Sequence, residues 1–310
     1  MGVATAFALL VFFLGASVGS FLNVVIYRVP HGRSILRPPS ACPACGTRIK
    51  AWQNIPVVSW LLLRGRCASC RSGISGRYPL VELTMGFLAL ALFHDFAGGW
   101  LTPDRLQTLD PFVDLMGPFA LYFGFIGALV AIAFMDLDHF IVPDSITLPG
   151  TVLGVVSAVA AGRTIGVTWA DALIGAIAGA GVLIGVILLY ATLTRREGMG
   201  GGDWKLLGFI GAWLGWQGLP FVLLAGSIQG LIFAAIFRRA FAVEELPPDP
   251  LDPSEPAPAP EPESDASAPK SFRHLAIPFG PFLALAAIEL LLFRVEIQTF
   301  FTHLFEGAAR

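Results

Sequence analysis

Two groups of aspartates, far apart in the sequence, stand at the ends of long apolar runs. The first group consists of Asp136, Asp138 and Asp144, and the second is Asp203, which follows Gly200, Gly201 and Gly202. A carboxylate near membrane depth is costly, so its presence usually signals a function. Two facing carboxyl groups share one proton, which makes one a base and the other an acid. Such a pair can activate water and protonate a leaving amine. Either group alone is equally consistent with ordinary loop carboxylates that are exposed to water.

Four cysteines form a second group of residues whose side chains could take part in chemistry. Cys42 and Cys45 make one C-x-x-C pair, Cys67 and Cys70 make another, and 21 residues separate the two pairs. This spacing favours a tetrahedral zinc ion, whose role would be structural because four thiolates leave no open position. Two disulfides or a redox pair are the alternatives, and a cytoplasmic location disfavours lasting disulfides. Gly46 and Gly73 follow the pairs, where we expect tight turns.

The elements that must position these groups are membrane helices. Hydrophobic residues make up 55% of the 310 residues and charged residues 14%, against about 25% charged residues in ordinary soluble domains. The apolar residues gather into runs long enough to cross a bilayer as helices. We therefore expect an all-α, polytopic membrane helix bundle of about eight spans. The expected spans are 3–27, 80–98, 117–135, 146–162, 171–193, 205–217, 219–237 and 275–296.

Charge predicts the orientation of this bundle. The segment 28–79 carries nine Lys or Arg and no Asp or Glu, and basic loops stay on the cytoplasmic side. Counting spans forward places both aspartate groups on that side as well. The positive-inside rule and attraction to anionic membrane lipid already explain this charge, so we do not expect nucleic-acid binding. The start of the chain lacks a basic region and a cleavage site, which favours a retained first span.

The sequence divides into five segments. We expect a first span at 1–27, a cytoplasmic basic four-Cys loop at 28–79, and a transmembrane core at 80–242. A Pro-rich acidic segment at 243–273 cannot bury a core and is predicted to be a disordered spacer. The last span and a tail occupy 274–310.

Several motifs in order resemble the bacterial type IV prepilin peptidases, the leader peptidase/N-methyltransferase family. Besides both cysteine pairs and the Asp136 group, the similar stretches are Gly19 to Arg28, Asn54 to Val57 with Ser59 and Trp60, Arg77 to Pro79 with Glu82 and Leu83, and Met199 to Asp203 with Lys205 and Leu206. The acidic insertion before the last span departs from the compact family pattern but touches none of these motifs.

The resemblance implies roles for particular residues. Family members use an intramembrane aspartyl pair, in which Asp203 of the Gly-x-Gly-Asp motif would be the second catalytic residue. Asp136, seven residues before Pro143, fits the first, with Asp138 and Asp144 as neighbours that share its cluster. Gly200, Gly202, Asp138, Asp144 and Lys205 would support the motif.

The resemblance also implies substrates and a methyl donor. Family members are bacterial inner-membrane enzymes that cut the basic leader from prepilins and pseudopilins at the cytoplasmic face, for type IV pili or type II secretion. They then methylate the new amino group with S-adenosylmethionine, and the Cys-containing loop marks the bifunctional form. Because the chain has no Rossmann-type glycine fingerprint, methylation rests on resemblance alone. The alternatives are a peptidase without methylation, a transporter with membrane-embedded carboxylates, and a zinc-dependent scaffold.

Overall fold

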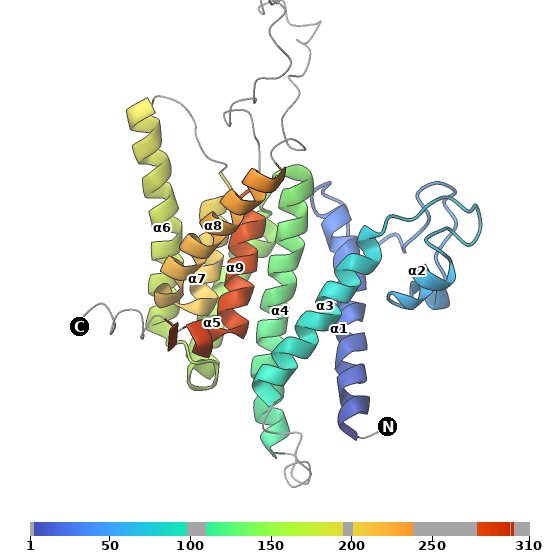
Figure 1. The fold of residues 1–310 in the computed structure, drawn as a ribbon, viewed down its shortest axis with the longest axis horizontal. Helices are drawn as coiled ribbons and strands as arrows, with labels where there is room; N and C mark the ends of the chain where they lie inside the picture. The colour runs from blue at the N-terminus through green and yellow to red at the C-terminus, as the bar shows by residue number, and fades with distance from the viewer. Residues whose placement is uncertain (1–2, 98–109, 195–200, 238–277, 298, 301–310) are drawn as a thin grey trace, which may run out of the picture.

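The computed structural model describes residues 3–97, 110–194, 201–237, 278–297 and 299–300, which form a helical bundle with a side loop (Figure 1). Within these residues the only extended pairings are two isolated bridges, so the predicted all-α class is confirmed. The predicted spacer at 243–273 lies outside the described residues. The helices are α1 (Val3–Arg28), α2 (Val58–Leu62), α3 (Arg77–Ala97), α4 (Asp110–His139), α5 (Asp144–Ile165), α6 (Trp169–Thr194), α7 (Asp203–Leu214), α8 (Leu219–Phe237) and α9 (Gly280–Leu292).

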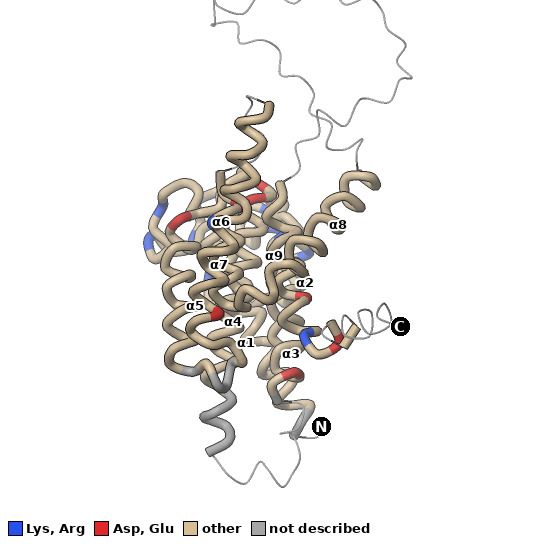
Figure 2. The backbone as a smooth tube through the Cα atoms, turned by 90° about the vertical axis from the view of Figure 1, so that its left-hand side faces the viewer, with Lys and Arg blue, Asp and Glu red and all other residues tan. Residues whose placement is uncertain are grey.

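Five of the described helices are long and apolar enough to cross a membrane, namely the ones that contain residues 5–28, 77–96, 116–139, 169–194 and 216–237. Two more apolar helices, over Asp144–Ala160 and Gly280–Leu292, are shorter than a full span. The expected count of eight spans is therefore not confirmed. Charged residues are sparse along the helices, as Figure 2 shows, which fits a bundle whose sides face lipid.

Helix α4 lies at the centre of the bundle. It contacts the α1–α3 pair on one side, and α5 and α9 on the other. Aromatic stacking joins it to α7, because the ring of Phe125 lies 5.2 Å from that of Phe209 and 5.1 Å from that of Trp213. These large buried rings fix how the ends of α4 and α7 meet.

Glycines allow two helix pairs to approach closely. A Cβ atom on Gly175 of α6 would lie 2.2 Å from the carbonyl oxygen of Gly211 in α7, and one on Gly19 of α1 would lie 2.8 Å from the carbonyl oxygen of Val81 in α3. Small residues at such crossings let helix backbones touch, which is the main way that helices associate in lipid. The α6–α7 contact, together with contacts to α5 and α9, holds the helix that carries Asp203.

Candidate functional site

Asp136 and Asp203 come together inside the bundle. Asp136 lies in the last turn of α4 and Asp203 is the first residue of α7. Their side chains are only 6% and 8% exposed, and the two carboxyl groups are close enough to interact electrostatically. Two buried like charges cannot both ionise easily, so this arrangement suits a pair that holds one proton. Such a pair has the chemical means to deprotonate a water molecule and to protonate a departing group.

Gly202 brings the two segments into contact. A Cβ atom at this position would lie 2.8 Å from the Cβ atom of Val142, in the segment that follows α4. The close approach therefore requires glycine, and it places the start of α7 beside the end of α4. Gly201 has open space around its Cα atom, and Gly200 lies outside the described residues.

The other two aspartates of the first group, Asp138 and Asp144, form ion pairs outside the buried pair. Asp138 forms an ion pair with Arg77 of α3, and Asp144 forms one with Lys205 of α7. Both of these aspartates are partly exposed, at 33% and 55%. The structure thus separates the cluster into one buried carboxyl group that meets Asp203 and two outer groups that tie α4 and α5 to adjacent helices.

Sequence reasoning missed one residue at this site, Gly280. Its backbone N–H, at the first turn of α9, donates a hydrogen bond of 3.0 Å to Oδ2 of Asp136. No charge or motif marks Gly280 in the sequence, and 143 residues separate it from Asp136. Only the tertiary packing of α9 against α4 reveals the contact.

The four cysteines converge in the loop between α1 and α3. Their Sγ atoms all lie within 4.8 Å of one another, and those of Cys42 and Cys70 are 3.8 Å apart. Four thiolates placed about 2.3 Å from a tetrahedral ion would lie about 3.8 Å from each other. The residues therefore fit a metal ion, as the spacing predicts.

The two cysteine pairs form knuckles with equivalent backbone hydrogen bonds. The N–H groups of Cys42 and Cys67 donate to the carbonyl oxygens five residues later, at Thr47 and Ser72. The expectation of a tight turn at both glycines is right for Gly46, which has φ +68°, and wrong for Gly73. In the second knuckle Arg71 takes the left-handed conformation with φ +62°, because it occupies the same position after the second cysteine as Gly46.

Hydrogen bonds prepare two of the thiols, those of Cys42 and Cys70, as ligands, whereas desolvation and the neighbouring Cys42 and Cys70 thiols raise the pKa of Cys67. The backbone N–H of Cys45 and the hydroxyl of Ser72 lower the pKa of Cys42 to about 6. The Ser72 hydroxyl also lowers the pKa of Cys70. A lowered pKa increases the thiolate fraction at neutral pH, and the thiolate is the form that binds metal.

Buried polar groups attach this loop to the bundle. Glu82 of α3, only 8% exposed, accepts a hydrogen bond of 2.7 Å from the backbone N–H of Val57, and it also bonds with Ser20 of α1. Asn23 of α1 donates to the carbonyl oxygen of Tyr78 at 3.1 Å. Three of the stretches that resemble the family, Gly19 to Arg28, Asn54 to Val57, and Arg77 to Pro79 with Glu82, thus meet at one junction between α1, α3 and the four-Cys loop.

Removing the Glu82 carboxyl should loosen this junction. In Glu82→Ala the partly buried N–H of Val57 loses its partner, which costs about 1 kcal/mol, whereas Glu82→Gln keeps an acceptor oxygen in reach. We expect protease sensitivity within residues 40–75 to rise in the alanine variant and to change less in the glutamine variant. Equal protection of the loop in wild type and Glu82→Ala would show that this contact does not hold it.

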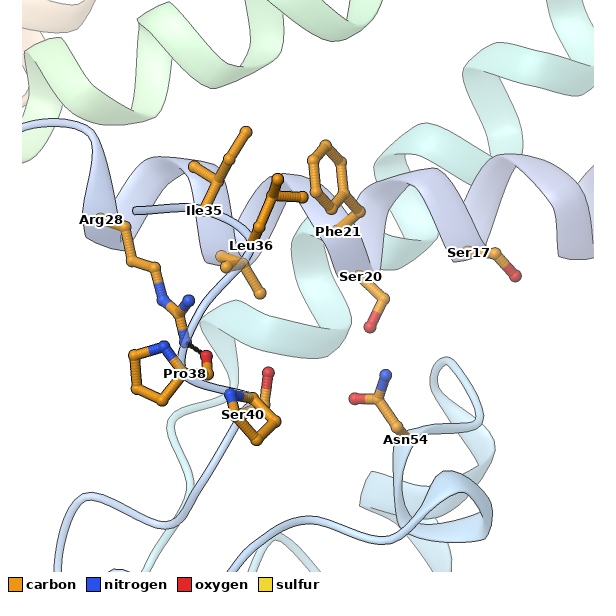
Figure 3. A pocket seen from close by; sticks show the side chains of 11 residues that line it. Ser17, Ser20, Phe21, Arg28, Ile35, Leu36, Pro38, Ser40 and Asn54 are labelled. Atoms are coloured by element: carbon orange, nitrogen blue, oxygen red, sulfur yellow. Dashed lines mark hydrogen bonds between the residues drawn. The ribbon is translucent and has the colours of Figure 1, made fainter. Parts of the chain in front are cut away.

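A cavity of about 280 Å³ lies between α1 and the four-Cys loop (Figure 3). Its wall combines apolar side chains such as Phe21 and Leu36 with the polar groups of Ser20 and Asn54. Arg28 lines one side, where its guanidinium donates to the carbonyl oxygen of Pro38 at 2.7 Å. The cavity is formed jointly by a membrane helix and the loop, so its shape depends on the junction at Glu82.

Comparison with known proteins finds two parts of the chain that match family descriptions. Residues 13–96 match the Bacterial Peptidase A24 N-terminal domain, and residues 123–235 match the Type IV leader peptidase family. A Prepilin leader peptidase/N-methyltransferase of Stutzerimonas stutzeri is 37% identical over 273 residues, which cover 80% of this chain and 87% of the relative. Proteins of the same name from Neisseria gonorrhoeae and Myxococcus xanthus are 38% and 37% identical, covering 73% and 92% of this chain and 81% and 90% of each relative. No solved structure matches the chain.

Proposed function

This chain belongs to the type IV leader peptidase family, and from that premise we propose that it removes the leader of prepilins and pseudopilins and then methylates the new amino terminus. The observation that carries the peptidase half is the buried meeting of Asp136 and Asp203. We assign these two residues as the catalytic pair. Asp138 and Asp144, which are exposed and ion-paired, are assigned to support of the fold.

In the hydrolysis of the peptide bond, one member of the pair takes a proton and the other gives one. The ionised carboxylate takes a proton from a water molecule while the water oxygen bonds to the scissile carbonyl carbon. The protonated partner gives its proton to the substrate, and the carbon–nitrogen bond then breaks to release an amine and a carboxylic acid. The shared burial of the two groups keeps one of them protonated, as this sequence of steps requires.

Cleavage by the purified protein tests this assignment. The protein is mixed with a prepilin in detergent, and loss of the leader is followed as a mobility shift on a gel and by mass spectrometry. We expect complete conversion at the leader junction. An intact prepilin after prolonged incubation with folded protein would contradict the proposed activity.

The site is proposed to face the cytoplasm from the inner membrane. The end of α4 that carries Asp136 lies at the same end of the bundle as the basic four-Cys loop, since the rings of His31 and His139 are 5.4 Å apart. Positive loops remain on the cytoplasmic side. A prepilin whose basic leader stays in the cytoplasm would therefore present its cleavage junction to this end.

The methyl-transfer half is proposed from the names of the relatives, with S-adenosylmethionine as donor. A methyl group passes from the sulfonium sulfur to the new terminal amine, so that a sulfur–carbon bond breaks, a carbon–nitrogen bond forms and the amine releases a proton. We propose that a zinc ion at the four thiolates has a structural role, which is to fix the loop beside α1 and α3.

Metal removal should separate the two activities. We expect about one zinc ion per chain in wild-type protein by mass spectrometry of the metal, and a loss of that metal in Cys42→Ser and Cys67→Ser. Because the four-Cys loop lies outside the helices that carry the two aspartates, the same variants should still cleave prepilin while losing methylation. Ser69→Ala, an exposed change within the second knuckle, is the matched control and should retain metal. Full zinc content in the cysteine variants would contradict the proposed site.

A further inference from the structure

Helix α9 contacts the aspartate pair, although it lies outside the parts of the chain that match the family. The matched segments are residues 13–96 and 123–235, and α9 begins at Gly280. Even so, the N–H of Gly280 donates to Oδ2 of Asp136 at 3.0 Å, and the atoms of this contact are buried. The last described long helix therefore contributes a backbone group to the site.

Only glycine at position 280 leaves the Asp136 carboxyl in its place. A Cβ atom on Gly280 would lie 2.5 Å from Oδ2 of Asp136 and 3.3 Å from Cδ2 of Leu206. Leu206 stands one turn after Asp203 on α7, so the space that glycine leaves open lies between the Asp136 carboxyl and the helix that carries Asp203. Any larger residue must push the Asp136 carboxyl away from the N–H group.

The two aspartates differ in their hydrogen-bonding environment. Asp136 accepts the Gly280 N–H, whereas among the described residues none donates a hydrogen bond to the Asp203 carboxyl. A hydrogen bond from an N–H group favours the negatively charged form of its acceptor. The pair is therefore built asymmetrically.

We propose that Gly280 and the first turn of α9 hold Asp136 as the ionised member of the pair, so that Asp136 deprotonates the water and Asp203 donates the proton to the substrate. This assignment rests on the proposed peptidase function and adds the roles within it. Gly280 is a positioning residue, because it acts through Asp136 and not on the substrate.

Each of the other charged groups described near the pair has an interaction partner. Asp203 on α7 interacts electrostatically with Asp136, and two buried negative charges that repel each other keep one group protonated. Arg77 on α3 is paired with Asp138, and Lys205 on α7 is paired with Asp144. Glu289, on α9 itself, accepts a hydrogen bond from Gln229, and His139, on α4, contacts the ring of His31 on the segment after α1. Gly280 is thus the described donor that distinguishes Asp136 from Asp203.

Gly280→Ala tests the proposal in the full-length protein. The added Cβ atom displaces the carboxyl and removes the hydrogen bond, so the ionised form of Asp136 loses its stabilisation. We expect kcat for prepilin cleavage to fall about tenfold or more, with KM changed less than about threefold. The acidic limb of the pH–rate profile should move to higher pH by about one unit, because a higher pH is then needed to ionise Asp136.

Gly230→Ala is the matched control. Gly230 lies on α8 and faces the Phe282 ring of α9, where a Cβ atom would make an ordinary contact of 3.4 Å. This variant alters the packing of α9 without touching the pair, and it should keep the wild-type pH profile. A wild-type kcat and pH profile in folded Gly280→Ala would overturn the proposal.

A second measurement uses wild-type protein and does not depend on the folding of any variant. A small epoxide alkylates an ionised carboxylate: the oxygen attacks a ring carbon, an ester forms, the ring opens, and the neighbouring acid protonates the released alkoxide. Peptide mapping after limited labelling near neutral pH should find the ester on Asp136. Labelling of Asp203, alone or to an equal extent, would overturn the assigned roles.

A wrong peptidase function and a wrong assignment of roles to the two aspartates give different results. If wild-type protein does not cut prepilin, or if variants of both aspartates still cut it, the peptidase function itself is wrong. If wild type cuts and both aspartates are required, but the label falls on Asp203, only the roles assigned through Gly280 are wrong.

Discussion

Asp136→Asn and Asp203→Asn are each expected to lower the rate of leader cleavage by about 10³-fold or more, since each removes one half of the acid–base pair. Asparagine keeps the size of the side chain but can neither take nor give the proton. Cleavage is measured as the initial rate of leader loss from a purified prepilin. Because the fold is preserved, both variants should still methylate a pilin that was cleaved beforehand, which separates a chemical defect from misfolding.

Asp138→Asn and Asp144→Asn provide controls from the same cluster. These carboxyl groups are partly exposed and form ion pairs with Arg77 and Lys205, and exposed ion pairs contribute little to stability. We expect cleavage within a few-fold of wild type in both variants. Inactive Asp138→Asn together with active Asp136→Asn would move the first catalytic role to Asp138.

Gly211→Ala is expected to destabilise the protein and to impair cleavage, although it changes one hydrogen into a methyl group. The added Cβ atom would lie 2.1 Å from the carbonyl oxygen of Gly175, so α6 and α7 must move apart. Overpacking of this kind costs about 1–3 kcal/mol and sometimes more. Displacement of α7 also moves Asp203, two turns earlier on the same helix, away from Asp136. Thermal unfolding in detergent and the cleavage rate are the measurements.

The same helix pair supplies a matched control. Gly181 and Gly185 lie on α6 with nothing within 4 Å of an added Cβ atom. In Gly181→Ala the higher helix propensity of alanine should leave Tm unchanged or slightly raised. A fall in Tm of equal size in Gly181→Ala and Gly211→Ala would show that the Gly175–Gly211 contact is not special.

Some properties follow from the sequence because they depend on local pattern. Long apolar runs with few charges determine a helical membrane bundle, since backbone polar groups in lipid must be satisfied within a helix. The spacing of Cys42, Cys45, Cys67 and Cys70 determines a four-thiol cluster, because each short knuckle fixes its own pair of ligands. The number of full spans does not follow so simply, because the apolar part of α5, Asp144–Ala160, and the helix α9 are both too short to meet the length of a span.

Other properties were decided by tertiary packing. Local pattern offered three aspartates near α4, and only the burial of α4 against α7 and α9 separates Asp136 from its ion-paired neighbours. Gly280 carries no side chain that a motif could register, and its N–H becomes important only because α9 begins beside Asp136. The sequence determined which helices and ligands this chain can form, whereas contacts between residues more than a hundred positions apart decided which carboxyl group receives the hydrogen bond.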